Sequence, residues 1–354
     1  MSYLDVRSRL EARERQLSPF AARSYRSRGR DRPEEPSPVR TEFQRDRDRI
    51  IHSKAFRRLK HKTQVFIAPT GDHFVTRLTH TLEVAQIART IARALNLNED
   101  LTEAMALGHD LGHTPFGHAG EAALAACLPD GFRHNEQSLR VVERLEKEGR
   151  GLNLTWEVRE GILKHSKPRE GITAEGWGTA STLEGQVLKI ADSVAYLNHD
   201  IADAVRAGLL RETDIPSDIR ETLGASHSQR IDTLVRDIVE HSWSATGELG
   251  TDVQPRIGLS PPILAATDAL REFMFQRVYL SDAMEEEGER AAEVVRFLFH
   301  YYCAHPEELP SDYGHAGDPL ERRVADHVAS MTDHYALRDA RRLGFPPERL
   351  PAVP

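Results

Sequence analysis

The sequence predicts an all-α protein. Apolar residues recur at intervals of three and four along most of the 354 residues, which is the period of an amphipathic helix. Convincing strands of alternating apolar and polar residues are absent, and no segment repeats another. Hydrophobic residues make up 39% of the chain and charged residues 29%, so the helices can bury a sizeable core beneath a solvated surface.

The first strong helical pattern lies at residues 84–95. Val84, Ile87, Ile91 and Leu95 share one helical face there, and the asparagines at 96–98 offer a stop signal. The pattern continues towards the C-terminus with shorter helices predicted at 101–107, 122–127, 139–145 and 158–163.

A loop is predicted at residues 167–180, which contain a proline and several glycines without any period. Ser181 and Glu184 then have the spacing of a capping box, so we expect a long helix through residues 187–201. Beyond Gly208, the periodicity predicts helices near 217–241, 262–280, 287–303 and 319–342.

Composition indicates a cytoplasmic protein. No run of about 18 apolar residues predicts a membrane span, and the first residues lack the apolar stretch of a secretory signal. The two cysteines, Cys127 and Cys303, are too few for a disulfide framework. We therefore expect a reducing compartment and no membrane partner.

The net charge of −8 is unevenly distributed. Residues 1–62 hold 18 Lys and Arg against 9 Asp and Glu, so this basic arm carries +9 and the rest of the chain −17. Residues 21–40 are either a solvated tail or a segment whose arginines meet the phosphates of a nucleotide or a nucleic acid.

Residues 108–121, GHDLGHTPFGHAGE, concentrate three histidines and two carboxylates among helix-breaking residues. Such a segment is either a polar turn or a site for a metal ion and proton transfer. Histidine nitrogens mixed with carboxylate oxygens suit Mg, Mn, Fe or similar cations. His109 and Asp110 are neighbours near a predicted helix end. Their side chains diverge by about 100°, so both can reach one ion only near the edge of the helix.

Two further ligand candidates lie on other predicted helices. His80 opens the helix before this segment, and Asp192 sits among apolar residues, where an unpaired carboxylate would be costly. A lone helical histidine is usually not a ligand, and the adjacent pair His109–Asp110 is also a weak signal alone. The combination of these residues on successive helices is more specific.

This pattern resembles the HD phosphohydrolase superfamily and, more narrowly, the bacterial dGTP triphosphohydrolase family. HDLGHTPFGHAGE followed by HNEQ is highly specific, whereas the HD pattern alone is only moderately so. Beyond residue 206 the resemblance is weak. The matching stretches are residues 40–66, 77–89, 108–121, 132–140 and 184–204.

The resemblance implies an HD-domain helical bundle with a C-terminal helical extension. We divide the chain into a basic arm with the first helices (1–62), the HD domain (63–206) and a C-terminal helical region (207–354). The resemblance also implies one divalent ion, for which we favour Mg or Mn over Fe, Ni or Co. Its implied ligands are His80, His109, Asp110 and Asp192.

The same resemblance implies that His113 lines the phosphate site and that His118, Glu121 and His134 carry out proton chemistry. Spacing supports the acid–base pair independently, because His118 and Glu121 are three residues apart at a helix start and share one face. A carboxylate beside an imidazole orients it and favours its protonated form. The alternative is a capping or surface role, which is stronger for His134, next to Asn135.

Substrate-binding residues are predicted on the helix that carries Asp192. Tyr196 and Asp200 follow it at i+4 and i+8, so the three share a face. Tyr196 would contact the sugar and disfavour a 2′-hydroxyl, and Asp200 would accept from the 3′-hydroxyl; ordinary packing is the alternative for Tyr196. The resemblance adds Gln64 to this sugar-reading pair.

Phosphate-binding cations are predicted near His80. Arg77, three residues before it, is the natural clamp for the triphosphate. Further candidates, each of which could equally be a surface residue, are Arg57, Arg58, Lys60 and Lys62.

We therefore expect a metal-dependent hydrolase that cleaves dNTPs, dGTP among them, to deoxynucleoside and inorganic triphosphate. The metal would activate water and polarise the α-phosphate, and His118 or His134 would protonate the leaving 5′-oxygen. One alternative is an HD phosphohydrolase acting on nucleoside monophosphates or guanosine tetraphosphate. Another is a nucleic-acid-binding regulatory protein with a vestigial HD site. A nucleotide effector and a homo-oligomer are compatible with the resemblance.

Overall fold

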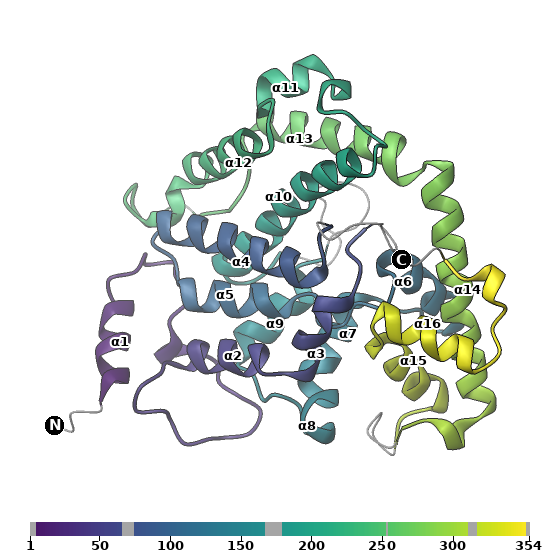
Figure 1. The fold of residues 1–354 in the computed structure, drawn as a ribbon. Coiled ribbons are helices and arrows are strands. Elements are labelled where there is room, and N and C mark those ends of the chain that lie inside the picture. The colour runs from purple at the N-terminus through teal and green to yellow at the C-terminus, as the bar shows by residue number, and fades with distance from the viewer. Residues whose placement is uncertain (1–4, 66–73, 167–178, 253, 311–316, 352–354) are drawn as a thin grey trace. The chain divides into compact units, whose positions relative to one another are not determined.

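The computed structural model describes residues 5–65, 74–166, 179–252, 254–310 and 317–351 (Figure 1). Within these ranges helices dominate and no strand occurs, although an isolated antiparallel bridge joins Thr63 and Thr76. The all-α prediction is confirmed. The α-helices are α1 (Val6–Glu14), α2 (Glu42–Ile51), α3 (Lys54–Arg58), α4 (Arg77–Ala94), α5 (Glu99–Gly108), α6 (Gly117–Cys127), α7 (His134–Arg140), α8 (Glu146–Gly149), α9 (Trp156–Lys164), α10 (Leu183–Arg206), α11 (Ser217–Leu223), α12 (His227–His241), α13 (Pro261–Met274), α14 (Asp282–Ala304), α15 (Leu320–Ser330) and α16 (Asp333–Arg342).

Three of the predicted C-terminal helices are interrupted. The helix expected at 217–241 is α11 and α12, because Gly224 between them has φ +113°. The helix expected at 319–342 is α15 and α16, because the Thr332 hydroxyl caps a new helix by accepting from the Tyr335 amide. The helix expected at 262–280 passes into a π-helical turn at Phe275–Tyr279. Of the loop predicted at 167–180, residues 167–178 lie outside the described ranges.

The capping box predicted at Ser181–Glu184 is wrong by one residue. Thr182 caps α10, and its hydroxyl accepts from the Gly185 amide at 3.1 Å. The fully buried Glu184 carboxylate instead accepts from the amides of Ala22 and Asn98, both at 3.0 Å. This carboxylate therefore satisfies two distant backbone donors, which a local capping pattern does not reveal.

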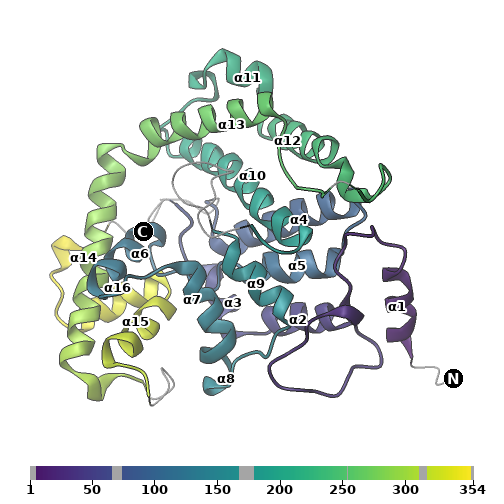
Figure 2. The ribbon, with the colours of Figure 1, turned by 180° about the vertical axis from the view of Figure 1, so that it is seen from behind.

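The chain divides into two compact units. Unit 1 comprises residues 1–51, 81–109 and 153–274, and unit 2 comprises residues 52–80, 110–152 and 275–354. In unit 1, α5 packs against α2, α9 and α10, and α10 also contacts α12 (Figure 2). Leu101 and Met105 of α5 are fully buried in this packing.

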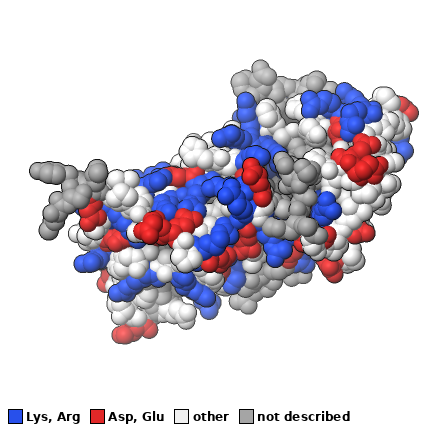
Figure 3. Space-filling model, turned by 90° about the horizontal axis from the view of Figure 1, so that it is seen from below, with Lys and Arg blue, Asp and Glu red and all other residues white. Residues whose placement is uncertain are grey.

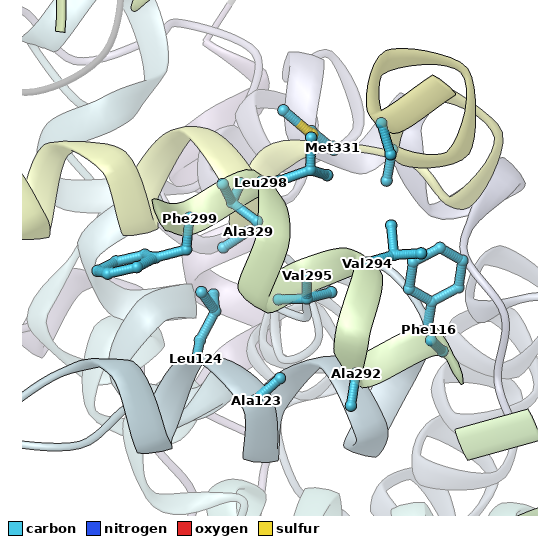
Figure 4. Close-up of a cluster of buried hydrophobic side chains, with 14 of the residues drawn as sticks. Phe116, Ala123, Leu124, Ala292, Val294, Val295, Leu298, Phe299, Ala329 and Met331 are labelled. Atoms are coloured by element: carbon cyan, nitrogen blue, oxygen red, sulfur yellow. The ribbon is translucent and has the colours of Figure 1, made fainter. Parts of the chain in front are cut away.

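Unit 2 is built around α14, which packs against α6, α15 and α16. Figure 4 shows apolar side chains of α6, α14 and α15 gathered in one cluster, among them Leu124, Val295, Leu298 and Ala329. Leu124, Val295 and Leu298 are fully buried, and each such side chain contributes roughly 1.5–3 kcal/mol of transfer free energy. The C-terminal helices thus form the core beneath α6.

The two halves of residues 21–40 differ. Residues 21–30 pack against other parts of unit 1, where the Glu157 carboxylate accepts from the Ser27 hydroxyl at 2.6 Å and the Arg28 amide at 2.7 Å. Residues 31–40 are mostly exposed. The solvated-tail alternative therefore fails for residues 21–30.

Acidic side chains of unit 1 neutralise several arginines of the arm. Arg30 pairs with Glu42 at 2.7 Å and contacts Asp46, and Arg45 pairs with Glu34 at 2.8 Å. Figure 3 shows Lys and Arg interspersed with Asp and Glu on the face it presents. Part of the arm's positive charge thus serves to hold unit 1 together. Among the described residues, no helix combines the length and the apolar character that a membrane span requires.

Candidate active site

The segment between α5 and α6 turns sharply. Glycines and residues in the left-handed backbone conformation permit the turn. Phe116 and Gly117 have φ of 60° and 55°, and the Thr114 hydroxyl donates to the Gly117 carbonyl at 2.8 Å. A Cβ at Gly112 would lie 2.1 Å from the backbone nitrogen of Ser138, so only glycine fits there. These constraints place the histidines of residues 108–121 on a tightly packed loop and the first turn of α6.

Asp110 is the centre of a buried group in unit 2. Arg77 donates from Nη1 to Oδ2 of Asp110 at 2.7 Å, and His80 Nε2 lies 3.8 Å from the same oxygen. His113 Nε2 lies 3.3 Å from the other carboxylate oxygen. All four side chains are almost completely buried, so the guanidinium compensates the cost of burying the carboxylate.

The pair His80–Asp110 has the donor chemistry of a metal site. A separation of 3.8 Å between Nε2 and Oδ2 is too long for a hydrogen bond. Two ligands of one ion, each at about 2.1 Å, can stand up to about 4.2 Å apart. An imidazole nitrogen and a carboxylate oxygen at this separation fit a divalent cation.

His109 and Asp192 form an equivalent pair in unit 1. His109 Nε2 lies 3.9 Å from Oδ1 of Asp192, and its Nδ1 lies 2.7 Å from the Ala106 carbonyl oxygen. The carbonyl therefore holds the proton on Nδ1, and Nε2 carries the lone pair that a metal ligand needs. Each pair lies within one unit, and convergence of both pairs on one ion stays a prediction.

Glu121 is shared by two histidines of unit 2. Its carboxylate lies 3.3 Å from Nδ1 of His118 and 3.0 Å from Nδ1 of His134. It also accepts from the backbone amide of His134 at 2.8 Å, where α7 begins. The structure thus brings His118 and Glu121 together on α6, as their spacing suggests, and adds His134 from the next helix.

The charges in this cluster are coupled. Burial alone would lower the pKa of His134, but the Glu121 carboxylate beside it raises that pKa above its ordinary value. Burial alone would raise the pKa of Glu121, but His134 and His118 hold it well below its usual range. The His118 side chain is 71% exposed and that of His134 only 13%. His134 and Glu121 therefore form the drier ion pair.

His113 stacks on His134, with ring centroids 4.0 Å apart and planes inclined by 15°. Burial and the nearby Arg77 hold the pKa of His113 well below its ordinary value, so this ring is neutral. Side-chain atoms of Asp110, His113 and His134 lie within 4.8 Å of one another. A carboxylate suited to a metal and an imidazolium suited to proton donation are therefore close neighbours.

The predicted phosphate-binding cations lie in different environments. Arg57 and Lys60 are exposed, and Arg58 is half-buried. Lys62 is buried, where its Nζ donates to the carbonyl oxygens of His113 and, at 2.8 Å, Ala329. Burial lowers the pKa of Lys62 to about 7. Lys62 thus supports the backbone of the site loop from within.

The predicted sugar-binding residues come from both units. Gln64 belongs to unit 2 and is buried, and within the described ranges its Oε1 has no hydrogen-bond partner. Asp192, Tyr196 and Asp200 all lie in α10 of unit 1. Asp192 and Tyr196 are half-buried, whereas Asp200 is 1% exposed.

Asp333 supports the site, although sequence reasoning did not single it out. One oxygen of its carboxylate accepts from the Phe116 amide at 3.0 Å, and the other accepts from the Thr63 amide at 2.8 Å. In the sequence, Asp333 follows the capping Thr332 and has the pattern of an ordinary first-turn acid. No local signal connects it to a loop more than two hundred residues earlier.

A pocket also opens in unit 2 behind the site loop. Its lining includes Leu111 and Gly112 of the loop together with Lys54, Arg58 and Lys62. Glu146 lines it too, but its carboxylate already accepts from the backbone amides that begin α3. The pocket therefore touches the loop without including the proposed ligands.

Replacing Asp333 with alanine is expected to destabilise unit 2, because it leaves two backbone donors without their carboxylate. Loss of such hydrogen bonds to a charged group costs about 1.5–3 kcal/mol each. Thermal denaturation should show a lower Tm, and turnover should fall because the Phe116 turn is less firmly held. Asp218→Ala, which removes an exposed first-turn acid of α11, is the control. An unchanged Tm for Asp333→Ala would contradict this anchoring role.

Comparison with known proteins places these features in a family. The chain matches the HD domain family over residues 77–197 and the phosphohydrolase-associated domain family over residues 257–342. It is 54% identical to the deoxyguanosinetriphosphate triphosphohydrolase-like protein of Caldanaerobacter subterraneus over 93% of both chains. Proteins with the same name from Desulfatibacillum aliphaticivorans and Cereibacter sphaeroides are 49% and 43% identical, covering 97% and 92% of this chain and 99% of their own lengths. The chain therefore belongs to the HD-domain family of deoxyguanosinetriphosphate triphosphohydrolase-like proteins.

Proposed function

We propose that this protein is a metal-dependent hydrolase that cleaves dNTPs, dGTP among them, to deoxynucleoside and inorganic triphosphate. The observation that carries the proposal is the position of the half-buried Glu121–His134 ion pair beside Asp110. One phosphate group can contact both a metal ligand and a proton donor there. The names of the relatives support a deoxyguanosine triphosphate as substrate.

His80, His109, Asp110 and Asp192 would hold one divalent ion, with Mg or Mn favoured and Fe, Ni or Co as alternatives. When bound, such an ion lowers the pKa of water and polarises a phosphoryl oxygen. The donor sets of both described pairs suit this role, since each joins an imidazole nitrogen to a carboxylate oxygen at 3.8–3.9 Å.

The protein's own residues would then bind the triphosphate and move protons. Arg77 orients the Asp110 carboxylate, and its charge offsets that of the phosphates. His113, which is neutral, lines the phosphate site. His134 or His118 donates a proton to the leaving 5′-oxygen, and Glu121 holds both rings at their Nδ1 atoms.

Incubation with each of the four dNTPs, alone and mixed, followed by anion-exchange analysis of the products, tests this proposal. Inorganic triphosphate and deoxynucleoside are expected. Release of orthophosphate from nucleoside monophosphates, or turnover of guanosine tetraphosphate, would favour another HD phosphohydrolase. Salt-dependent DNA binding without turnover would favour the regulatory alternative. Faster turnover in the mixture than with single nucleotides would identify a nucleotide effector. A change in the protein's molecular mass in solution on adding a nucleotide would identify an oligomer.

Sugar selectivity is expected to depend on Tyr196 and Asp200. Tyr196→Ala should narrow the difference between dGTP and GTP, because a 2′-hydroxyl would crowd the ring. Asp200→Asn should weaken dNTP hydrolysis by about 1.5–3 kcal/mol, as expected for a lost hydrogen bond to a charged group. Steady-state kinetics on both nucleotides measure these effects, with metal content as the control. Equal hydrolysis of GTP and dGTP by the wild type would disprove the assignment.

A further inference from the structure

His199 contacts both residues proposed to read the sugar. Its side chain is 2% exposed, and its Nδ1 lies 2.8 Å from Oδ1 of Asp200. Its ring meets that of Tyr196 edge-on, with centroids 6.3 Å apart and planes at 90°. Neighbouring side chains on a helix diverge by about 100°, so the contact with Asp200 requires the two side chains to turn towards each other.

Several charged groups of unit 1 surround His199. Asp200 and Asp203 belong to α10, and Glu83 approaches from α4. Two further groups, His227 at the start of α12 and Arg206 at the end of α10, act to lower the pKa of Glu83. Arg206 also pairs with Asp203 at 2.5 Å. Three carboxylates therefore face a buried imidazole, with the cationic groups around them.

This arrangement favours the charged form of the ring. Burial alone would lower the pKa of His199, but Asp200, Glu83 and Asp203 raise it above its ordinary value. These carboxylates thus stabilise the imidazolium form of His199 to higher pH than an ordinary histidine retains it. Burial raises the pKa of Glu83, which marks Asp200 as the main anionic partner of the ring.

We infer that His199 is a positioning residue that holds the Asp200 carboxylate and the Tyr196 ring in place for recognition of the 3′-hydroxyl of the sugar. The inference rests on the proposed function, because it takes a deoxyribose as the group bound beside α10. A cation close to a carboxylate that is 1% exposed offsets the cost of burying its charge. A carboxylate can only accept hydrogen bonds, so Asp200 selects a sugar that donates one.

The ratio of kcat/KM for dGTP to kcat/KM for 2′,3′-dideoxy-GTP isolates this effect, because the two nucleotides differ only in the 3′-hydroxyl. Groups that act on both nucleotides alike cancel in the ratio. His199→Gln should reduce the preference for dGTP by about tenfold, mainly through KM, with kcat and metal content nearly unchanged. His241→Gln is the control, since His241 lies in the same unit but is exposed at the end of α12.

The wild type supplies a second measurement that needs no variant. The pKa of His199 is raised, so the imidazolium persists above pH 6.5 and is lost as the pH rises through the raised value. The preference for dGTP over the dideoxy analogue should therefore fall on the alkaline side. Calorimetric binding of both nucleotides across pH, with divalent ions removed by a chelator, gives this ratio without turnover.

The outcomes separate the two proposals. Failure of the wild type to release triphosphate overturns the proposed function, and the calorimetric ratio still decides the role of His199. Triphosphate release with an unchanged dGTP preference in His199→Gln overturns the positioning role. A wild-type binding preference that is constant from pH 6 to pH 10 overturns it as well, even if the variant does not fold.

Discussion

Replacing Asp110 with alanine is expected to remove metal binding and nearly all turnover. The carboxylate of Asp110 faces His80, its proposed partner ligand, and has His113 on its other side. A bound metal supplies several kcal/mol of transition-state stabilisation, and each 1.36 kcal/mol is a factor of ten in rate. Turnover should therefore fall by at least about a thousandfold, and metal analysis should show lost occupancy.

The same variant should also be less stable, because it leaves the buried Arg77 guanidinium without its carboxylate partner. Removing one member of a buried ion pair costs about 3–5 kcal/mol. Asp110→Asn is the matched control, since its amide oxygen can still accept from Arg77. It should lose the metal to the same extent but unfold at a higher temperature than Asp110→Ala. Full metal occupancy in Asp110→Ala, with the fold intact by circular dichroism, would refute the ligand assignment.

Removal of the histidines proposed to transfer protons is expected to have the second-largest effect. His118→Ala and His134→Ala should each retain the metal and lose about 10²–10⁴-fold in turnover, the usual contribution of a general acid or base. A double variant that combines either change with Glu121→Ala should lose less turnover than the two single variants lose together, because both rings share the Glu121 carboxylate. Near-native turnover of His118→Ala would assign proton donation to His134 or to water.

The pH profile distinguishes a catalytic pair from a purely structural contact. In Glu121→Gln, His134 loses the anion that raises its pKa, so the imidazolium is lost at lower pH. The alkaline limb of kcat should therefore move towards neutrality. Glu136→Gln, which changes an exposed acid in the same helix as His134, should leave the profile unchanged. If both histidine variants keep native turnover, this cluster has no role in proton transfer.

The sequence alone determined the helical class and the order of the chemical groups. Both depend on short-range information: the three- and four-residue period makes a helix amphipathic wherever it packs. The spacing of His118 and Glu121 likewise predicts their contact, because residues three apart in α6 lie on one helical face.

Tertiary structure alone decided which distant groups support the site. Glu121 reaches His134 on another helix, Asp333 holds the Phe116 amide, and Lys62 binds the His113 carbonyl. Each contact satisfies a buried polar group with a partner far away in the chain, so no periodicity or local motif marks it. The need to pair every buried donor and charge acts on the folded molecule as a whole, and only the fold reveals which residue meets it.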